Sequence, residues 1–198
     1  MSELILDPRR TAVVVIDLQK GIVQFGGNPH SSQTVIANAA ALLDAARSAG
    51  AQAILVHVDI SPDGGDALKV ECDQPMRMGG ALPPDWSELI PELDRQPGDL
   101  VILKRQPDAF FGTELELQLR RRGLDTIILC GIATEFGVEA TARDANQRGF
   151  EQVFAEDAMT ARLAESHANS IANIFPRMGR VRSTAEIVAA LRAGKAGA

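Results

Sequence analysis

Residues 125–145 read DTIILCGIATEFGVEATARDA, and this stretch decides how the chain folds. It starts with Thr126–Cys130, a short apolar and β-branched run that is typical of a buried strand. A turn bounded by Gly131 and Gly137 follows, and then residues with helical spacing up to Gly149. A strand, a glycine-bounded turn and a helix in this order predict one unit of a parallel sheet.

The same alternation of strand and helix extends along the chain. Further strands are predicted at Ala12–Ile16, Ala53–Val58, Leu100–Leu103, Gln152–Ala155 and Arg180–Arg182. Helices are predicted over Val35–Ala49, Thr113–Arg122, Glu139–Arg148, Ala164–Ile174 and Thr184–Leu191, the last after Ser183 as N-cap. Most of these strands are apolar on both faces, so helices must cover both sides of the sheet. We therefore predict a three-layer α/β/α sandwich, Rossmann-like, with a six-stranded parallel sheet.

The segment Ile60–Pro97 does not fit this alternation. It contains six prolines and four glycines and shows little periodicity. A connection of this length is usually functional in a compact domain. Its apolar residues Met76, Met78, Leu82 and Trp86 favour a segment that covers a pocket or packs on a second subunit.

Length and charge narrow the class of protein. The 198 residues fit one domain spanning positions 1–198. A net charge of −6 and a pI near 5.1 argue against nucleic acid or an anionic membrane as partner. No apolar run approaches 18 residues, and the N-terminus MSELILDPRR lacks the apolar stretch of a signal peptide. We expect a cytoplasmic protein.

The cysteines and histidines are scattered. Cys72 and Cys130 form no CxxC pair, and a disulfide is not expected in a reducing compartment. His30, His57 and His167 show no paired ligand spacing. We predict no metal site and no cofactor.

Two ionisable residues come at the ends of predicted strands. Asp17 follows Ala12–Ile16, and Lys104 follows Leu100–Leu103. Ligands of open α/β sheets bind at the carboxyl ends of the strands, where the turn before Gly137 is also expected. A lysine beside an aspartate makes a polarised pair for proton transfer, and backbone N–H groups at the start of a helix stabilise an oxyanion. Each residue alone is equally compatible with a turn or cap.

Three motifs together are recognisable. They are VVVIDLQ with Asp17, VILKRQPDAFFGTELELQLRRRG with Lys104, and CGIATEFGVEATARDA. In this order and spacing the chain resembles the isochorismatase-like (cysteine hydrolase) family along nearly its whole length. The resemblance implies a six-stranded α/β/α sandwich that assembles as a homodimer or homotetramer and acts on a small molecule.

In the amidases of that family an acid, a lysine and a cysteine form the catalytic triad. By resemblance the acid is Asp17 and the lysine is Lys104. The cysteine position is Gly137 here, so a covalent mechanism lacks its nucleophile. Cys130 lies seven residues earlier within the strand and is expected to be a buried small hydrophobe.

The resemblance also implies an oxyanion hole and a cis peptide bond. The N–H groups of Gly137 and Ala133 would bind the oxyanion, with the cis bond at Ile132–Ala133. True isochorismatases also carry glycine at the nucleophile position and hydrolyse a vinyl ether, with the aspartate as proton donor.

Two departures separate this chain from true isochorismatases, and one separates it from nicotinamidases. It has KRQPDAF where isochorismatases resemble KWRYSAF, and Ala133 where they tend to have tyrosine. No histidine follows Asp59, where nicotinamidases have part of a metal site.

Five further residues are candidates for the substrate pocket: Gln19, Phe25, Phe110, Ile132 and Glu135. Of the aromatic residues only Phe110 is supported by the resemblance. Glu135 is also explained as a favourable acid in the first helical turn.

Two functions remain open from the sequence. The first is a hydrolase of a small organic molecule that works without a cysteine nucleophile, with Asp17 as proton-transfer group. The second is a catalytically inactive small-molecule binding or assembly protein on the same fold, since a fold does not fix a function.

Overall fold

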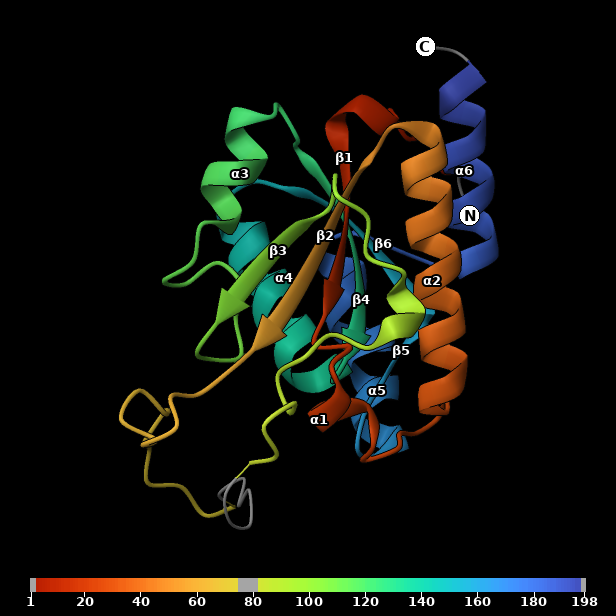
Figure 1. Ribbon diagram of the computed structural model, residues 1–198. Helices are drawn as coiled ribbons and strands as arrows, with labels where there is room; N and C mark the ends of the chain where they lie inside the picture. Colours follow the sequence, from red (N-terminus) through yellow and green to blue (C-terminus); the bar gives the residue numbers. More distant parts are fainter. Residues whose placement is uncertain (1–2, 75–81, 197–198) are drawn as a thin grey trace.

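The computed structural model describes residues 3–74 and 82–196. Within them six parallel strands form one sheet in the order β3-β2-β1-β4-β5-β6. The strands are β1 (Thr11–Ile16), β2 (Gln52–Val58), β3 (Leu100–Lys104), β4 (Thr126–Ile132), β5 (Glu151–Thr160) and β6 (Arg180–Arg182). Their carboxyl ends point toward the lower end of the molecule in Figure 1. The predicted six-stranded parallel sheet is confirmed.

Helices cover both faces of this sheet (Figure 1). They are α1 (Lys20–Val23), α2 (Ser32–Ala49), α3 (Leu115–Arg121), α4 (Glu139–Gln147), α5 (Ala164–Asn169) and α6 (Thr184–Ala196). Short 3₁₀ turns occupy Pro8–Arg10, Pro91–Leu93 and Phe175–Arg177, and π-helical turns occupy Thr134–Val138 and Ser170–Ile174. Helices α2 and α6 pack together on one face, and α3 and α4 lie on the other.

The helix ends follow their capping residues. Ser31 caps α2, where its Oγ accepts a hydrogen bond from the Thr34 N–H, so this helix starts three residues before the predicted position. At α6 the Glu186 carboxylate accepts from the Ser183 N–H and the Ser183 hydroxyl accepts from the Glu186 N–H. This reciprocal capping box confirms the predicted N-cap at Ser183.

The core lies on both sides of β1, as the two-sided apolar strands predicted. Val13 and Val15 pack against α2, and Val14 and Ile16 pack against α3 and α4. All four side chains are buried, and successive strand residues point to opposite faces of a sheet. Because its side chains are packed on both faces, β1 fixes the position of the residue that follows its carboxyl end, Asp17.

Strand β5 differs from the sequence prediction. It was expected to end at Ala155 but runs to Thr160, and its pairing with β4 shifts between Leu129↔Phe154 and Gly131↔Met159. The extra residues on β5 form an irregular stretch next to the carboxyl end of the sheet. Such bulges re-aim side chains, and this one turns Glu156 out of the regular ladder.

The structure describes residues 60–74 and 82–97 of the long segment 60–97. Residues 83–93 pack on their own chain: the Gly21 N–H donates to the Trp86 carbonyl, and the Ile90 N–H donates to the Leu18 carbonyl. Trp86 is buried against Gly21, where even a Cβ would lie 2.0 Å from the indole. This part therefore fastens the loop that follows β1. Met76 and Met78 lie outside the described residues.

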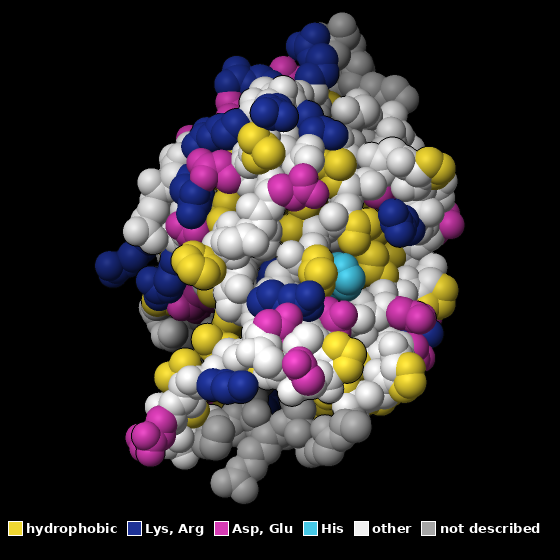
Figure 2. Space-filling view, turned by 60° about the vertical axis from the view of Figure 1, so that its left-hand side comes forward, with side chains coloured by type: hydrophobic (Ala, Val, Ile, Leu, Met, Phe, Trp, Pro, Cys, Tyr) yellow, Lys and Arg dark blue, Asp and Glu magenta, His cyan; other side chains and the backbone are white. Residues whose placement is uncertain are grey.

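None of the described helices is long and apolar enough to cross a membrane. Figure 2 shows basic and acidic side chains interspersed on the face that it presents.

Candidate active site at the carboxyl ends of β1, β3 and β4

Asp17 and Lys104 meet at the carboxyl edge of the sheet. The Lys104 ammonium lies 2.8 Å from Oδ2 of Asp17, and both side chains are almost fully buried. Two backbone crossovers diverge at this point, since α2 follows β1 on one face and α4 follows β4 on the other. This is the topological switch point, where open α/β sheets bind ligands.

The geometry explains why these residue types are needed. Asp17 has a left-handed backbone (φ 53°), which turns the chain out of β1 directly after Ile16. Lys104 is on β3, two strands away from β1 in the sheet order. Two strand spacings are about 10 Å, so only a long side chain can reach across β2 to the aspartate.

The loop after β3 holds the lysine in place. The Lys104 ammonium also donates to the Pro107 carbonyl at 2.6 Å. Two residues later the Ala109 N–H donates to the Thr141 hydroxyl, which itself donates to the Gly137 carbonyl. These bonds join the KRQPDAF stretch to α4, through Thr141, and to the turn that carries Gly137.

The two oxygens of Asp17 differ. Oδ2 is paired with Lys104, whereas Oδ1 is buried and has no hydrogen-bond partner among the described residues. Burial raises the pKa of Asp17 to about 6, although attraction to Lys104 and, less, to His57 lowers it. A carboxyl group with this pKa, and with one oxygen that makes no hydrogen bond to a described residue, is suited to give or take a proton near neutral pH.

Position 137 faces the pair directly. A Cβ added at Gly137 would lie 3.2 Å from Asp17 Oδ2 and 3.3 Å from Lys104 Nζ. Gly137 is part of the π-helical turn Thr134–Val138, which leads into α4. A side chain at this position would therefore contact both members of the pair, as the resemblance to cysteine hydrolases implies.

The strand before this turn approaches β1 very closely. Gly131 has φ 118°, and a Cβ there would lie 2.0 Å from the carbonyl oxygen of Ile16. Only glycine fits this position, because its neighbour is backbone. The peptide bond Ile132–Ala133 is cis, as the resemblance implied.

Gln19 is engaged with backbone. Its amide nitrogen donates to the carbonyls of Val58 and Trp86, and its amide oxygen accepts from the Val58 N–H. These bonds tie the loop after β1 to β2 and to residues 83–93. They indicate a positioning role.

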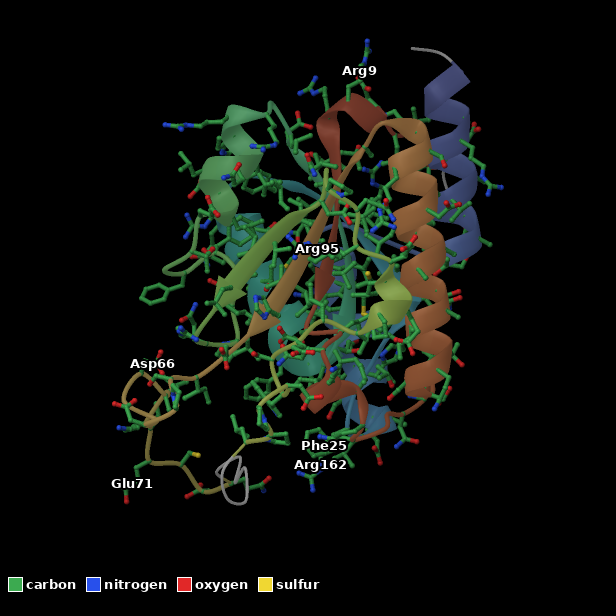
Figure 3. The ribbon with its side chains drawn as sticks, in the orientation of Figure 1. Arg9, Phe25, Asp66, Glu71, Arg95 and Arg162 are labelled. Carbon is green, nitrogen blue, oxygen red and sulfur yellow. The ribbon has the colours of Figure 1, made fainter. Side chains whose placement is uncertain are left out.

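The remaining predicted pocket residues lie in different surroundings. Phe25 is 73% exposed and projects at the lower end of the molecule (Figure 3), whereas Phe110 is buried against Phe150. Ile132 is buried next to the cis bond. One Glu135 oxygen accepts from the Arg162 N–H, and the other is buried without a partner among the described residues. Of these four, Ile132 ends β4 just before the turn that carries Gly137, and Glu135 lies within that turn.

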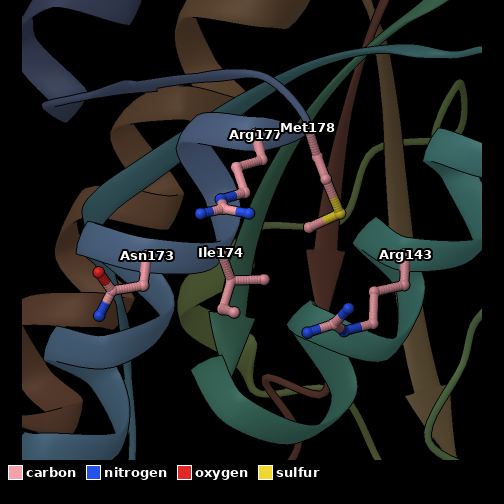
Figure 4. A pocket seen from close by; sticks show the side chains of 5 residues that line it. All are labelled: Arg143, Asn173, Ile174, Arg177 and Met178. Atoms are coloured by element: carbon pink, nitrogen blue, oxygen red, sulfur yellow. The ribbon is translucent and has the colours of Figure 1, made fainter.

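A separate pocket of about 400 Å³ lies on the α4 side of the molecule. It is lined by Arg143, Asn173, Ile174, Arg177 and Met178 (Figure 4). The Arg143 guanidinium is already paired with the Glu139 carboxylate at 2.8 Å. None of its lining residues belongs to the Asp17–Lys104 pair, so it is not part of the candidate active site.

A cluster that the sequence did not predict lies near the same edge. His30, Glu156 and His167 bring three possible metal-ligand atoms within 4.8 Å of one another. Burial, and to a smaller extent His30, lowers the pKa of His167 to about 4. His30 is more than 120 positions before Glu156 and His167, and those two are 11 positions apart, so the paired ligand spacings did not reveal the cluster.

Comparison with known proteins establishes the family. The sequence model of the protein family described as Isochorismatase domain matches residues 11–186 of this chain. The chain is 50% identical over 186 residues to the isochorismatase family protein YecD of Escherichia coli O157:H7, covering 94% of this chain and 98% of that one. It is 48% identical over 189 residues to the isochorismatase family protein YwoC of Bacillus subtilis (strain 168), covering 95% and 97%.

A solved structure agrees with this similarity. An isochorismatase family protein from Burkholderia thailandensis superimposes with a TM-score of 0.91 at 42% identity, covering 96% of this chain and all of that one. The chain therefore belongs to the isochorismatase family, and it has that family's hydrolase fold.

Proposed function

We propose that this protein hydrolyses a small organic molecule without a cysteine nucleophile, with Asp17 as the proton-transfer group. One observation carries the proposal. Oδ2 of Asp17 is paired with Lys104 and faces Gly137, whereas Oδ1 is buried and unpartnered among the described residues. A desolvated carboxyl of this kind is costly for folding, and such groups cluster at functional sites.

Hydrolysis of a vinyl ether fits these groups. The protonated Asp17 carboxyl gives its proton to the terminal alkene carbon, and an oxocarbenium ion forms. Water adds to the cationic carbon and returns a proton to Asp17, and the resulting hemiketal splits into a ketone and an alcohol. Lys104 holds Asp17 and sets its charge, and no covalent enzyme intermediate is needed. Backbone N–H groups at Gly137 and Ala133 are proposed to bind an anionic oxygen of the substrate.

The missing side chain at position 137 supports this choice over an amidase mechanism. Cys130, the nearest cysteine in sequence, is fully buried within β4, and burial raises the pKa of its thiol to about 12. A thiol with that pKa is not a nucleophile near neutral pH.

Assembly and location are part of the same proposal. We expect a homodimer or homotetramer, because Phe25, Phe136 and Leu163 expose large apolar side chains. We expect the reaction to take place in the cytoplasm, where Cys72 and Cys130 would stay reduced, as they are free here.

A turnover screen tests the proposal. Vinyl ethers and amides of small carboxylic acids are incubated with the protein, and products are identified by mass spectrometry, with thermal shift measured in parallel. We expect consumption of vinyl ethers that iodoacetamide does not inhibit. Compounds that stabilise the protein but are never consumed would instead support a binding protein on this fold.

A further inference from the structure

We propose that His30, Glu156 and His167 form a binding site for a divalent transition metal of the zinc type, separate from the Asp17–Lys104 pair. The three side chains offer ligand atoms that all lie within 4.8 Å of one another. Two imidazoles and one carboxylate are a ligand set that zinc uses, with water in the fourth position.

One pair of these side chains already approaches metal-binding geometry. Nε2 of His30 lies 3.6 Å from Oε2 of Glu156. Two ligands at ordinary zinc distances in a tetrahedron are about 3.4 Å apart. The rings of His30 and His167 pack edge to face with centroids 5.5 Å apart. Since the three ligand atoms lie within 4.8 Å of one another, a bound ion needs an inward shift of roughly 1 Å by the third ligand.

His167 has the orienting hydrogen bond that metal-binding histidines need. Its Nδ1 lies 2.9 Å from the Thr134 hydroxyl, and both residues are buried. That contact fixes the ring and leaves Nε2 as the nitrogen for the metal. In metal-binding histidines, a hydrogen bond from the ring nitrogen that does not bind the metal usually sets the orientation and tautomer of the ring.

The backbone delivers the other two ligands. Glu156 lies in the stretch of β5 where the register with β4 breaks, so a regular strand would not place it here. His30 is held through its carbonyl, which accepts from the Thr160 hydroxyl at 2.7 Å. The neighbouring Asn28 and Ala161 exchange two backbone hydrogen bonds. Both ligands are therefore anchored to the same end of β5.

A metal at this site would join parts of the chain that frame the active site. His30 comes from the connection before α2, Glu156 from β5 and His167 from α5. Thr134 begins the π-helical turn that carries Gly137. The ion would thus fix the turn next to the catalytic pair without contacting that pair itself.

The test is a titration of the full chain after treatment with EDTA and dialysis. Zinc binding is measured by calorimetry, and Co²⁺ is added to a second sample as a spectroscopic probe of tetrahedral coordination. We expect one Zn²⁺ per chain, no binding of Mg²⁺, and a melting temperature raised by about 5 °C at 100-fold excess over Kd.

Four variants separate this site from adventitious binding. Glu156→Gln and His30→Ala should bind Zn²⁺ at least 10-fold more weakly and lose the thermal shift, and both side chains are partly exposed, so both variants should fold. The controls Cys72→Ser and His57→Gln remove the exposed thiol and the remaining histidine and should bind like the wild type. Unchanged affinity in Glu156→Gln and His30→Ala, or its loss in a control, would overturn the proposal.

Discussion

The substitution Gly137→Cys tests the arrangement of the site most sharply. The new Cβ would lie 3.2 Å from Asp17 Oδ2 and 3.3 Å from Lys104 Nζ, which puts the sulfur within about 4 Å of the ammonium. The tightest contact, 3.0 Å to Cγ2 of Ile16, is with a side chain that can shift by a few tenths of an ångström. We expect a folded variant that is less stable by about 1 kcal/mol.

The thiol pKa follows from these neighbours. Moving the thiol proton to Asp17, whose pKa is about 6, costs roughly 3 kcal/mol from an ordinary thiol. The attraction between a thiolate and the lysine at about 4 Å is worth about 4 kcal/mol at an effective dielectric constant of 20. The attraction offsets this cost, so we expect the pKa of the new thiol to lie well below that of a free cysteine.

Labelling with iodoacetamide at pH 5.5, followed by peptide mass spectrometry, measures the effect. A lowered thiol pKa raises the thiolate fraction at pH 5.5 by more than it lowers the intrinsic nucleophilicity of the thiolate, so labelling should be roughly 10 times faster than at an ordinary thiol. Gly98→Cys is the matched control, because a Cβ there meets nothing within 4 Å. A folded Gly137→Cys protein that labels no faster than this control would refute the proposed arrangement.

Four further outcomes follow from the structure. In the proposed mechanism the protonated form of Asp17, whose pKa is about 6, is the acid, so kcat/KM should be constant below pH 6 and fall tenfold per pH unit above it, as a pH–rate profile will measure. The same raised pKa means that the folded state binds this proton more tightly than the unfolded chain. The contribution of Asp17 to stability is therefore full below pH 3.8 and falls by roughly 3 kcal/mol as the pH rises through 6, which urea titrations at several pH values will test against Asp17→Asn. Gly131→Ala should lower the free energy of unfolding by about 3 kcal/mol or more, because the new Cβ would lie 2.0 Å from the Ile16 carbonyl oxygen. Near-wild-type stability in thermal unfolding would contradict the close approach of β4 to β1. Arg47→Ala should cost about 3 kcal/mol in urea unfolding, because it leaves the carboxylate of Asp99, 2.6 Å away and 2% exposed, without its cation; a loss below 1 kcal/mol would be inconsistent with a buried pair.

The fold and the Asp17–Lys104 pair were accessible from the sequence because their signals are local. Apolar runs predicted five of the six strands, and Asp17 and Lys104 each come at a strand end, where the parallel sheet brings them to one edge. The position opposite the pair was identified as Gly137 only through the resemblance to the family. The catalytic roles of these residues remain predictions.

Other features were not accessible because they depend on distant contacts. The register between β4 and β5 shifts after the pair Leu129↔Phe154, and the residues of the run Gln152–Ala155 do not predict this shift. His30 and His167 come from opposite ends of the sequence and meet only after folding. The aromatic residues show the same limit, because composition alone cannot tell the exposed Phe25 from the buried Phe110.

The most direct test of proton transfer by Asp17 is the turnover of the first identified substrate by Asp17→Asn. The substitution keeps the size of the side chain and removes the proton that it can donate. We predict that kcat falls at least about 100-fold while thermal unfolding stays cooperative and the ligand still stabilises the protein. Turnover within a few-fold of the wild type in a folded Asp17→Asn protein would contradict the account.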